Sequence, residues 1–473
     1  MTALGFKNAR VVRSSWLHEG GRRLDCNPYM SGALEARDAL MRLGCPKNRL
    51  AEVTHGMFDS GRSSRDWVDD QKYGVRYMGS SAIGLADLSA LPLISKKQVA
   101  RNPRLLLEEG WSLITRSGTI GRMAYVRPDM AGLACSEDVL RVVPDPNRIP
   151  PGYLYSFLSS RYGVPLVISG TYGAIIQHIE PGHIADLPVP RFESAFEDMV
   201  HAKVEEAATT LSKHQDLLDR ATDLLFRLAD VPNPSAAEWR ASTEDLGFEV
   251  GSYELEPLRA WNHSRKVRNI IDTIERGDYS VLADVVDLDW IRWRVMFKRI
   301  DADQENGIEV ISQKPLFQLF PEGRWISKKY LLNHSPRYVV PDRTIIVAKQ
   351  GTLGEDELYC RCAFITGERA LRRAYTDHCM RIVAQSSEIE PGYLFAFLRS
   401  NAGFRILRGL SEGSKQQDLH WRTVPTISVP RLTQAQEEEI ANMVYQAYED
   451  RNAAVDLMIE AKDLVENKIH TGR

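Results

Sequence analysis

The sequence IPPGYLYSFLSS, residues 149–160, decides the fold because a near copy, IEPGYLFAFLRS, occupies residues 389–400. The two stretches agree at eight of twelve positions, whereas residues drawn at average frequencies would agree at roughly one. Further along the chain, the same offset of 240 matches Val-Pro-Arg at 189–191 with Val-Pro-Arg at 429–431. A period this long indicates a duplicated half, because solenoid repeats are only ~20–50 residues long.

A second matched motif lies upstream of the first. Gly-Thr-Ile-Gly at 118–121 matches Gly-Thr-Leu-Gly at 351–354, at an offset of 233. The difference between the two offsets predicts a seven-residue insertion in the second half, between this motif and the strand that follows it.

Each half has the same predicted order of elements. β-Rich runs at 111–115 and 344–348 lead into the Gly-Thr-x-Gly turns. Short apolar helices are predicted at 153–158 and 393–398, and strands bounded by proline at 187–190 and 426–430.

A long helix closes each half, at 193–229 and at 433–469. Apolar residues recur along both helices in steps of four and three, which is the seam of a coiled coil. The first seam contains Val200, Val204, Ala207, Leu211, His214, Leu218, Ala221, Leu225 and Leu228. The second contains Ile440, Val444, Ala447, Ala454, Met458, Ala461 and Val465, with Arg451 interrupting it. Each seam needs a partner, so we expect the two helices to pack against each other.

The predicted fold class is therefore α+β. Two similar β-rich domains with short helices are joined by two long antiparallel coiled-coil helices, related by a pseudo-twofold axis. The predicted boundaries are 1–192 for the first domain, 193–230 for the first helix, 231–282 for a linker and the start of the second half, 283–432 for the second domain, and 433–473 for the second helix.

Charge is divided unevenly along the chain, although the formal net charge is only −3. Each long-helix region carries nine acidic and four basic residues, which leaves the remainder at +7. Acidic helices beside basic domains fit a protein that binds a polyanion through its domains. Solvated helices are often acidic in any case, so charge alone also allows a protein with no nucleic-acid partner.

Composition bounds the environment of the chain. The opening residues MTALGF contain no apolar core of a secretory signal, and no apolar run is long enough to span a membrane. Six scattered cysteines fit free thiols in a reducing cytoplasm, where we expect the protein to reside without membrane contact. Cys360 and Cys362 lack a second pair at metal-ligand spacing, so we expect structural thiols and no metal site.

Motifs of the common catalytic classes are missing from the sequence. It has no phosphate-binding lysine loop, no dinucleotide-binding glycine fingerprint and no nucleophile elbow. Pro341-Asp342 and Lys349 are spaced as in some nucleases, but Val347 stands where the second acidic residue is needed. We therefore expect a non-catalytic chain.

The ordered set of motifs, present twice, resembles the specificity subunit of type I restriction–modification systems. In the first half the resemblance rests on WSLITRSGTIGR at 111–122, the strand 137–143, Gly-Tyr-Leu at 152–154, Gln177 with His178, and Leu-Pro-Val-Pro at 187–190. The second half repeats the set at 351–354, 392–400, 413–419 and 427–430. The Gly-Thr-x-Gly motif alone is weak, whereas the order of the whole set, followed each time by a long helix, is specific.

The resemblance implies that each globular part is a target-recognition domain and that the long helices are the spacer that binds methyltransferase subunits. It implies a DNA-recognition subunit that reads a bipartite double-stranded target and positions two methyltransferase subunits, with or without a restriction/translocase subunit, for adenine methylation and anti-phage defence. S-adenosylmethionine would belong to the methyltransferase, and this chain would carry no cofactor. The alternatives are a free-standing DNA-binding regulator or sensor of the same fold, and an enzyme with a divergent site.

Candidate DNA contacts are the side chains that can bind bases or phosphates from loops. In the first half they are Arg62, Arg65, Arg116, Ser117, Thr119, Arg122, Tyr172, Gln177 and His178. In the second half they are Arg292, Arg294, Lys298, Lys349, Gln350, Thr352, Lys415, Gln416 and Gln417. Packing of a β-turn explains the glycine loops equally well. The candidate spacer and partner-binding residues are Val200, Val204, Leu211, Leu218, Leu225, Ile440, Val444, Met458 and Val465.

Overall fold

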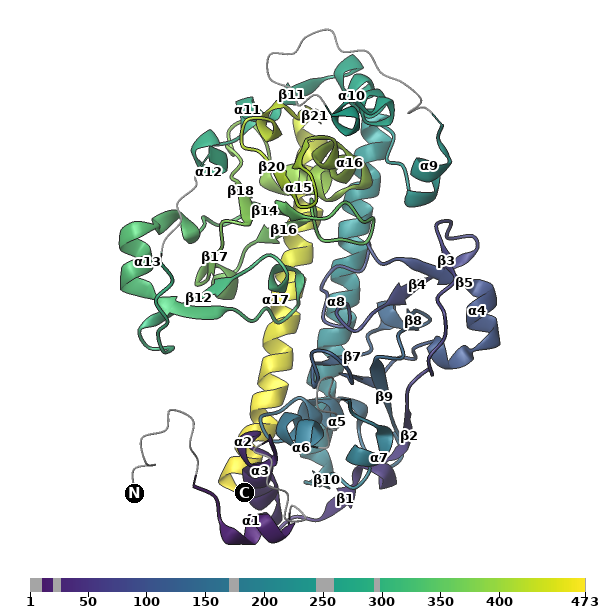
Figure 1. Ribbon diagram of the computed structural model, residues 1–473, viewed down its shortest axis with the longest axis vertical. Coiled ribbons are helices and arrows are strands. Elements are labelled where there is room, and N and C mark those ends of the chain that lie inside the picture. Colours follow the sequence, from purple (N-terminus) through teal and green to yellow (C-terminus); the bar gives the residue numbers. More distant parts are fainter. Residues whose placement is uncertain (1–10, 20–26, 170–177, 244–258, 293–297, 473) are drawn as a thin grey trace. The chain divides into compact units, whose positions relative to one another are not determined.

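The computed structural model describes residues 11–19, 27–169, 178–243, 259–292 and 298–472 (Figure 1). The chain divides into two compact units. The first contains residues 1–84, 91–212 and 453–473, and the second contains 85–90 and 213–452. No helix in the described part of the chain has the length and hydropathy needed to cross a bilayer.

The first unit is built on two four-stranded sheets, ordered β2-β9-β6-β7 and β3-β5-β4-β8, and on a β1-β10 pair. Its strands are β1 Lys47–Arg49, β2 Thr54–Phe58, β3 Trp67–Val68, β4 Gly74–Met78, β5 Leu93–Ser95, β6 Ser112–Thr115, β7 Met123–Tyr125, β8 Ala134–Cys135, β9 Val139–Pro144 and β10 Pro188–Pro190. Its short helices are α1 Ser14–Glu19, α2 Asn27–Met30, α3 Ala33–Arg42, α4 Lys96–Arg101, α5 Pro151–Leu158, α6 Gly163–Ser169 and α7 Pro181–Ile184.

The second unit repeats this arrangement with shorter sheets, ordered β13-β12-β17, β16-β14-β18, β15-β20-β19 and β11-β21. Its strands are β11 Tyr279–Val281, β12 Gly307–Ile311, β13 Arg324–Ser327, β14 Thr344–Ala348, β15 Gln350–Gly351, β16 Cys362–Ile365, β17 Ala374–Tyr375, β18 Cys379–Ile382, β19 Ser411–Gly413, β20 Gln417–Leu419 and β21 Ser428–Pro430. Its short helices are α9 Ala236–Ala241, α10 Arg265–Arg276, α11 Leu282–Val285, α12 Leu288–Arg292, α13 Lys328–His334, α14 Glu368–Leu371, α15 Pro391–Arg399 and α16 Asn401–Gly409.

The duplication extends to the strand register. Tyr77 pairs with Ala134 in the parallel β4-β8 ladder, and Val310 pairs with Ala374 in the parallel β12-β17 ladder. Parallel pairs are uncommon in small sheets joined by short loops. Their recurrence at the predicted offsets therefore confirms that the two halves share one fold.

Buried polar contacts are duplicated as well. Tyr153 Oη donates to Pro190 O across 2.6 Å, and Tyr393 Oη donates to Pro430 O across 2.7 Å. Each bond ties the apolar helix, α5 or α15, to the strand that leads into the long helix. The repeated Gly-Tyr-Leu motif thus supplies both an apolar face and one fixed hydrogen bond per half.

The long helices are α8 Ser194–Ala229 and α17 Gln434–Thr471, within two residues of their predicted limits. Each contributes residues to both units. In the first unit, Lys203 Nζ lies 3.0 Å from Glu460 Oε2. In the second, the Nδ1 atom of His214 lies 2.8 Å from Ala447 O. Within the first unit, Lys468 Nζ also lies 3.1 Å from Glu193 Oε1, so residue numbers rise along α8 as they fall along α17 and the two helices are antiparallel there, as predicted.

The predicted seam is buried, with one exception. Leu228 is 37% exposed because it lies in the last turn of α8, so its assignment to the seam was wrong. The nine residues predicted to form the spacer and bind partners are at most 6% exposed. Their side chains are therefore part of the hydrophobic cores of the two units.

Candidate nucleic-acid interface

In each unit the loop after the central strand meets a second loop at the same register. Ser117 forms an antiparallel bridge with His178 in the first unit. In the second unit, Gln350 pairs with Asp418 between β15 and β20. The residues that meet are therefore equivalent in the two halves but differ in chemistry.

Arg116 is held by acidic groups in the first unit. It forms ion pairs with Asp59, at 3.2 Å, and with Glu180. Its Nε also donates to Ile179 O across 3.0 Å. This network fixes the base of the loop, so Arg116 supports the loop in this structure and its guanidinium is not directed at solvent.

The remaining first-half candidates divide between bound and exposed side chains. The Ser117 hydroxyl donates to Asp138, at 2.5 Å, and Arg65 donates to Glu137 across 3.1 Å. Arg62 and Thr119 are exposed, and Arg122 is half-buried. Arg62 and Thr119 therefore remain candidates for DNA contact. Tyr172 and Gln177 lie outside the described residues.

Lys349 and Gln350 sit at the base of the second-half loop. Lys349 is only 5% exposed and lies 3.9 Å from Asp418 Oδ1. Gln350 Nε2 donates to Asp418 Oδ2 across 3.2 Å. Lys349 occupies the position of Arg116, since each accepts a backbone bond from the second loop, from Leu419 N and Ile179 N respectively.

The loop between β19 and β20 separates three neighbouring candidates by exposure. Lys415 and Gln416 are exposed, as is Thr352 on the facing loop. Gln417 is 3% exposed; it accepts from Arg259 across 3.1 Å and donates to Ser414 O across 2.6 Å. Gln417 is therefore part of the internal frame of the loop, while Lys415 and Gln416 remain candidates for DNA contact.

Trp421 and Arg422 were not predicted from the sequence, and they form a basic and aromatic cluster with the predicted candidate Arg292. The guanidinium groups of Arg292 and Arg422 lie 5.7 Å and 5.0 Å from the Trp421 ring centroid. Trp421 and Lys349 also line one small depression of the surface. The sequence could have indicated this cluster by its position, because His420, Trp421 and Arg422 follow the candidate loop directly. Exposed guanidinium groups on an aromatic platform suit contact with phosphates and bases.

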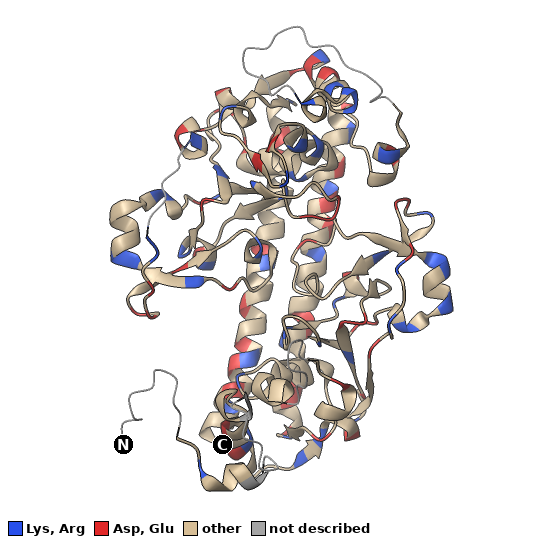
Figure 2. Ribbon diagram, in the orientation of Figure 1, with Lys and Arg blue, Asp and Glu red and all other residues tan. Residues whose placement is uncertain are grey.

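Other basic residues are spread over both units. Figure 2 shows Lys and Arg interspersed with Asp and Glu along the ribbon. Lys298 is exposed, whereas Arg294 lies outside the described residues. A Lys-Lys pair begins each of α4 and α13, at residues 96–97 and 328–329, and Ser95 and Ser327 cap those helices. Their place at capped helix starts explains the repetition without any DNA contact.

The predicted position of the insertion was wrong in part. Gly121 N donates to Thr115 O across 3.0 Å, and Cys360 N donates to the equivalent Ala348 O across 2.7 Å. Both residues have positive φ angles, 83° and 68°. Cys360 thus occupies the turn position of Gly121, and six of the extra residues lie inside the loop. Gly354 matches Gly121 in sequence only.

Among the described residues, no group of His, Cys, Asp and Glu side chains is arranged to hold a metal ion. Burial raises the pKa of the Cys362 thiol to about 12 and that of Cys379 to about 11. The thiols are therefore protonated at neutral pH, as suits structural cysteines.

Similarity to known proteins is found among solved structures. No family model and no curated protein matches the chain. The S subunit of the type I restriction–modification system from M. genitalium is similar at a TM-score of 0.37 and 10% identity, over 90% of this chain and 96% of that one. The HsdS subunit from Thermoanaerobacter tengcongensis is similar at 0.28 and 14% identity, over 91% and 96%. A chain from a structure that describes complex assembly and conformational transition of the type I R-M system is similar at 0.27 and 14%, over 91% and 98%.

Proposed function

We propose that the protein is the DNA-recognition subunit of a methylation complex and that it reads a bipartite double-stranded target. One observation carries the proposal. The bridge between Ser117 and His178 recurs at the same register as the pairing of Gln350 with Asp418, with different side chains. Duplicated scaffolds with different loop chemistry suit the recognition of two different half-sites.

The side chains available to the two readers differ. Thr119 and Arg62 are exposed in the first unit, whereas Thr352, Lys415 and Gln416 are exposed in the second. Lysine and arginine favour guanine edges or phosphates, and glutamine favours adenine edges. Different sets of donors and acceptors give each unit its own preference.

The long helices are proposed to dock the partner proteins. A helix of 36 residues is about 54 Å long at 1.5 Å per residue, compared with about 34 Å for one turn of B-DNA. Its outer face is acidic, while the side chains of its seam are buried. We propose that two methyltransferase subunits bind these outer faces and supply S-adenosylmethionine and adenine methylation, with or without a restriction/translocase subunit. This chain then contributes recognition and no catalysis, inside the cytoplasm.

Sequencing of modified bases in the source organism tests the proposal. Genomic DNA from the wild type should contain a methylated motif of two short half-sites around an unread gap. Deletion of this gene should abolish that motif. A methylation pattern that is unchanged by the deletion would exclude the function. Co-purification of a methyltransferase with the tagged full-length chain separates a complex subunit from a free-standing regulator.

A further inference from the structure

The second-unit loop between β14 and β16 is held by two arginines of α16. Arg408 donates from Nη1 to Leu353 O and from Nη2 to Gly354 O, both across 2.7 Å. Arg405 Nη1 lies 2.7 Å from Glu355 Oε2, and its second amino group contacts Glu355 Oε1. These bonds hold the longer loop of the second unit at three consecutive positions, 353–355.

The same cluster concentrates positive charge in the interior. Arg361, Arg405 and Arg408 lie 3.7 Å, 5.2 Å and 4.0 Å from the centroid of the Phe404 ring. Arg405 and Arg408 are 4% and 2% exposed, and Glu355 is the carboxylate that pairs with Arg405. Burial, with the neighbouring Arg408, lowers the pKa of Arg361 to about 10. Burying more cations than anions costs free energy that apolar packing would avoid.

The equivalent helix of the first unit, α6, has apolar side chains at the positions where α16 has arginines. At an offset of 240, the residues on α6 are Val164, Pro165 and Ile168. A Cβ atom on Gly121 would lie 2.9 Å from Ile168 Cδ1, so the short loop already packs directly on this helix. The arginine cluster therefore accompanies the longer loop and is absent from the equivalent helix positions of the first half.

We propose that Arg405 and Arg408 are positioning residues that set the base preference of the second unit by fixing the loop 352–359. This inference rests on the proposed DNA-recognition function. The loop carries Thr352 and follows β15, which pairs with β20, the strand that begins directly after Lys415 and Gln416. Arg408 reaches two backbone carbonyls with a forked group, so it defines where the loop backbone runs and thereby where its exposed side chains lie.

The test replaces these residues in the full-length gene and sequences modified bases in the source organism. Arg408→Lys keeps the charge but loses the fork, and Arg408→Ile installs the first-half residue. The double variant Glu355→Gln with Arg405→Gln removes the ion pair without leaving an uncompensated charge. Arg372→Lys is the matched control, because its side chain is 76% exposed and pairs with Glu368 in an i,i+4 contact.

The expected result is a relaxation of about five- to tenfold in base discrimination at one half-site, the same one that Lys415→Ala relaxes, with the other half-site unchanged. The control should retain both preferences. If the Arg408→Ile protein does not accumulate, Arg408→Lys and the double variant still test the positioning role. Unchanged preference in these variants, or equal loss at both half-sites, would overturn the positioning role alone. A wild type without any motif that depends on this gene would overturn the proposed function and this inference together.

Discussion

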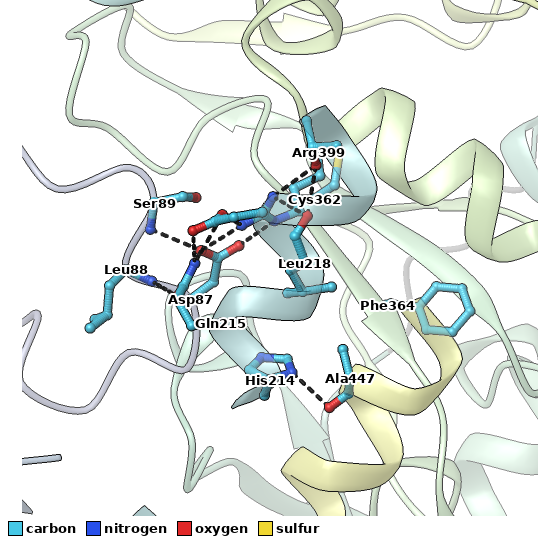
Figure 3. Close-up of polar contacts among 12 residues, drawn as sticks. Asp87, Leu88, Ser89, His214, Gln215, Leu218, Cys362, Phe364, Arg399 and Ala447 are labelled. Atoms are coloured by element: carbon cyan, nitrogen blue, oxygen red, sulfur yellow. Dashed lines mark hydrogen bonds and ion pairs between the residues drawn. The ribbon is translucent and has the colours of Figure 1, made fainter. Parts of the chain in front are cut away.

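Arg399 and Asp87 form an ion pair, with Nε 2.6 Å from Oδ2, that holds the loop 85–90 within the second unit (Figure 3). Arg399 also donates to Asp219 Oδ1 across 2.8 Å and to Thr222 Oγ1 across 3.0 Å. The loop is secured further by Gln215, which accepts from Leu88 N across 2.7 Å. A segment from the first half of the sequence is thus part of the second unit.

Replacing Arg399 should destabilise the second unit. Its side chain is 6% exposed and makes the bonds to Asp87, Asp219 and Thr222, so Arg399→Met should cost about 2–4 kcal/mol in the free energy of unfolding. Urea denaturation followed by circular dichroism measures the change. Arg372→Met, which removes an exposed pair, should cost less than about 1 kcal/mol. Equal effects of the two substitutions would contradict the importance of the Asp87 contact.

The same pair predicts acid lability. Burial alone would raise the pKa of Asp87, but the Arg399 guanidinium outweighs burial and holds that pKa well below its usual value. A carboxyl group with a pKa lower in the folded than in the unfolded chain stabilises the fold above the unfolded pKa of about 4. This stability is lost as the pH falls toward the folded pKa.

Urea midpoints at pH 7, 5, 4 and 3 should therefore fall steeply below about pH 4 in the wild type. Asp87→Asn should be less stable than the wild type at pH 7 and lose less on acidification. The control Asp216→Asn replaces an exposed carboxylate, 64% accessible, and should leave the wild-type pH profile in place. Parallel profiles for Asp87→Asn and the wild type would exclude the linkage.

The fold was predictable because the spacing of apolar residues along the sequence indicates which side chains are buried in helices and strands. The seam residues Val204 and Ile440 are fully buried, and the predicted run at 344–348 is β14 without change. The roles of polar side chains were less predictable. Lysine at 349 and glutamine at 417 can bind DNA by type, but only the three-dimensional packing reveals that both are internal.

The loop insertion illustrates a second limit. The sequence match aligned Gly354 with Gly121. In the structure, the residue in the equivalent left-handed turn position is Cys360, with φ 68°. A residue other than glycine rarely adopts this conformation, so the sequence carried no signal for it. The arginine cluster on α16 was also missed, because its partner carbonyls at 353 and 354 have no sequence signature.

The duplicated tyrosines give a matched pair of substitutions. Tyr153→Phe and Tyr393→Phe each remove one buried hydrogen bond to a proline carbonyl, at 2.6 Å and 2.7 Å. Each should cost about 1–2 kcal/mol, because the buried carbonyl loses its donor. Urea denaturation should give similar losses for the two variants. A cost confined to one of them would show that the shared geometry does not carry shared energetics.

Substitutions in the loop 411–419 can distinguish an effect on DNA recognition from an effect on stability. Lys415→Ala and Gln416→Ala alter exposed side chains and should weaken one half-site preference with stability changed by less than about 0.5 kcal/mol. Gln417→Ala removes the bonds to Arg259 and Ser414 and should destabilise the unit by about 1–3 kcal/mol. Gel shifts with half-site variants and thermal unfolding of the same full-length samples measure both quantities. A stable Gln417→Ala protein with altered base preference would return this residue to the set of direct contacts.

The contact between the long helices gives the last prediction. Leu211 is fully buried at the seam, whereas Met199 on the same helix is 42% exposed. Leu211→Ala should cost about 3 kcal/mol because it leaves a cavity, and Leu211→Pro should also break the backbone hydrogen bonds of α8. Met199→Ala should change stability by less than about 0.5 kcal/mol. Helical circular dichroism during urea denaturation measures all three. If Leu211→Ala lowered capture of the methyltransferase without lowering stability, the seam would have to open and contact the partner directly, against the burial seen here.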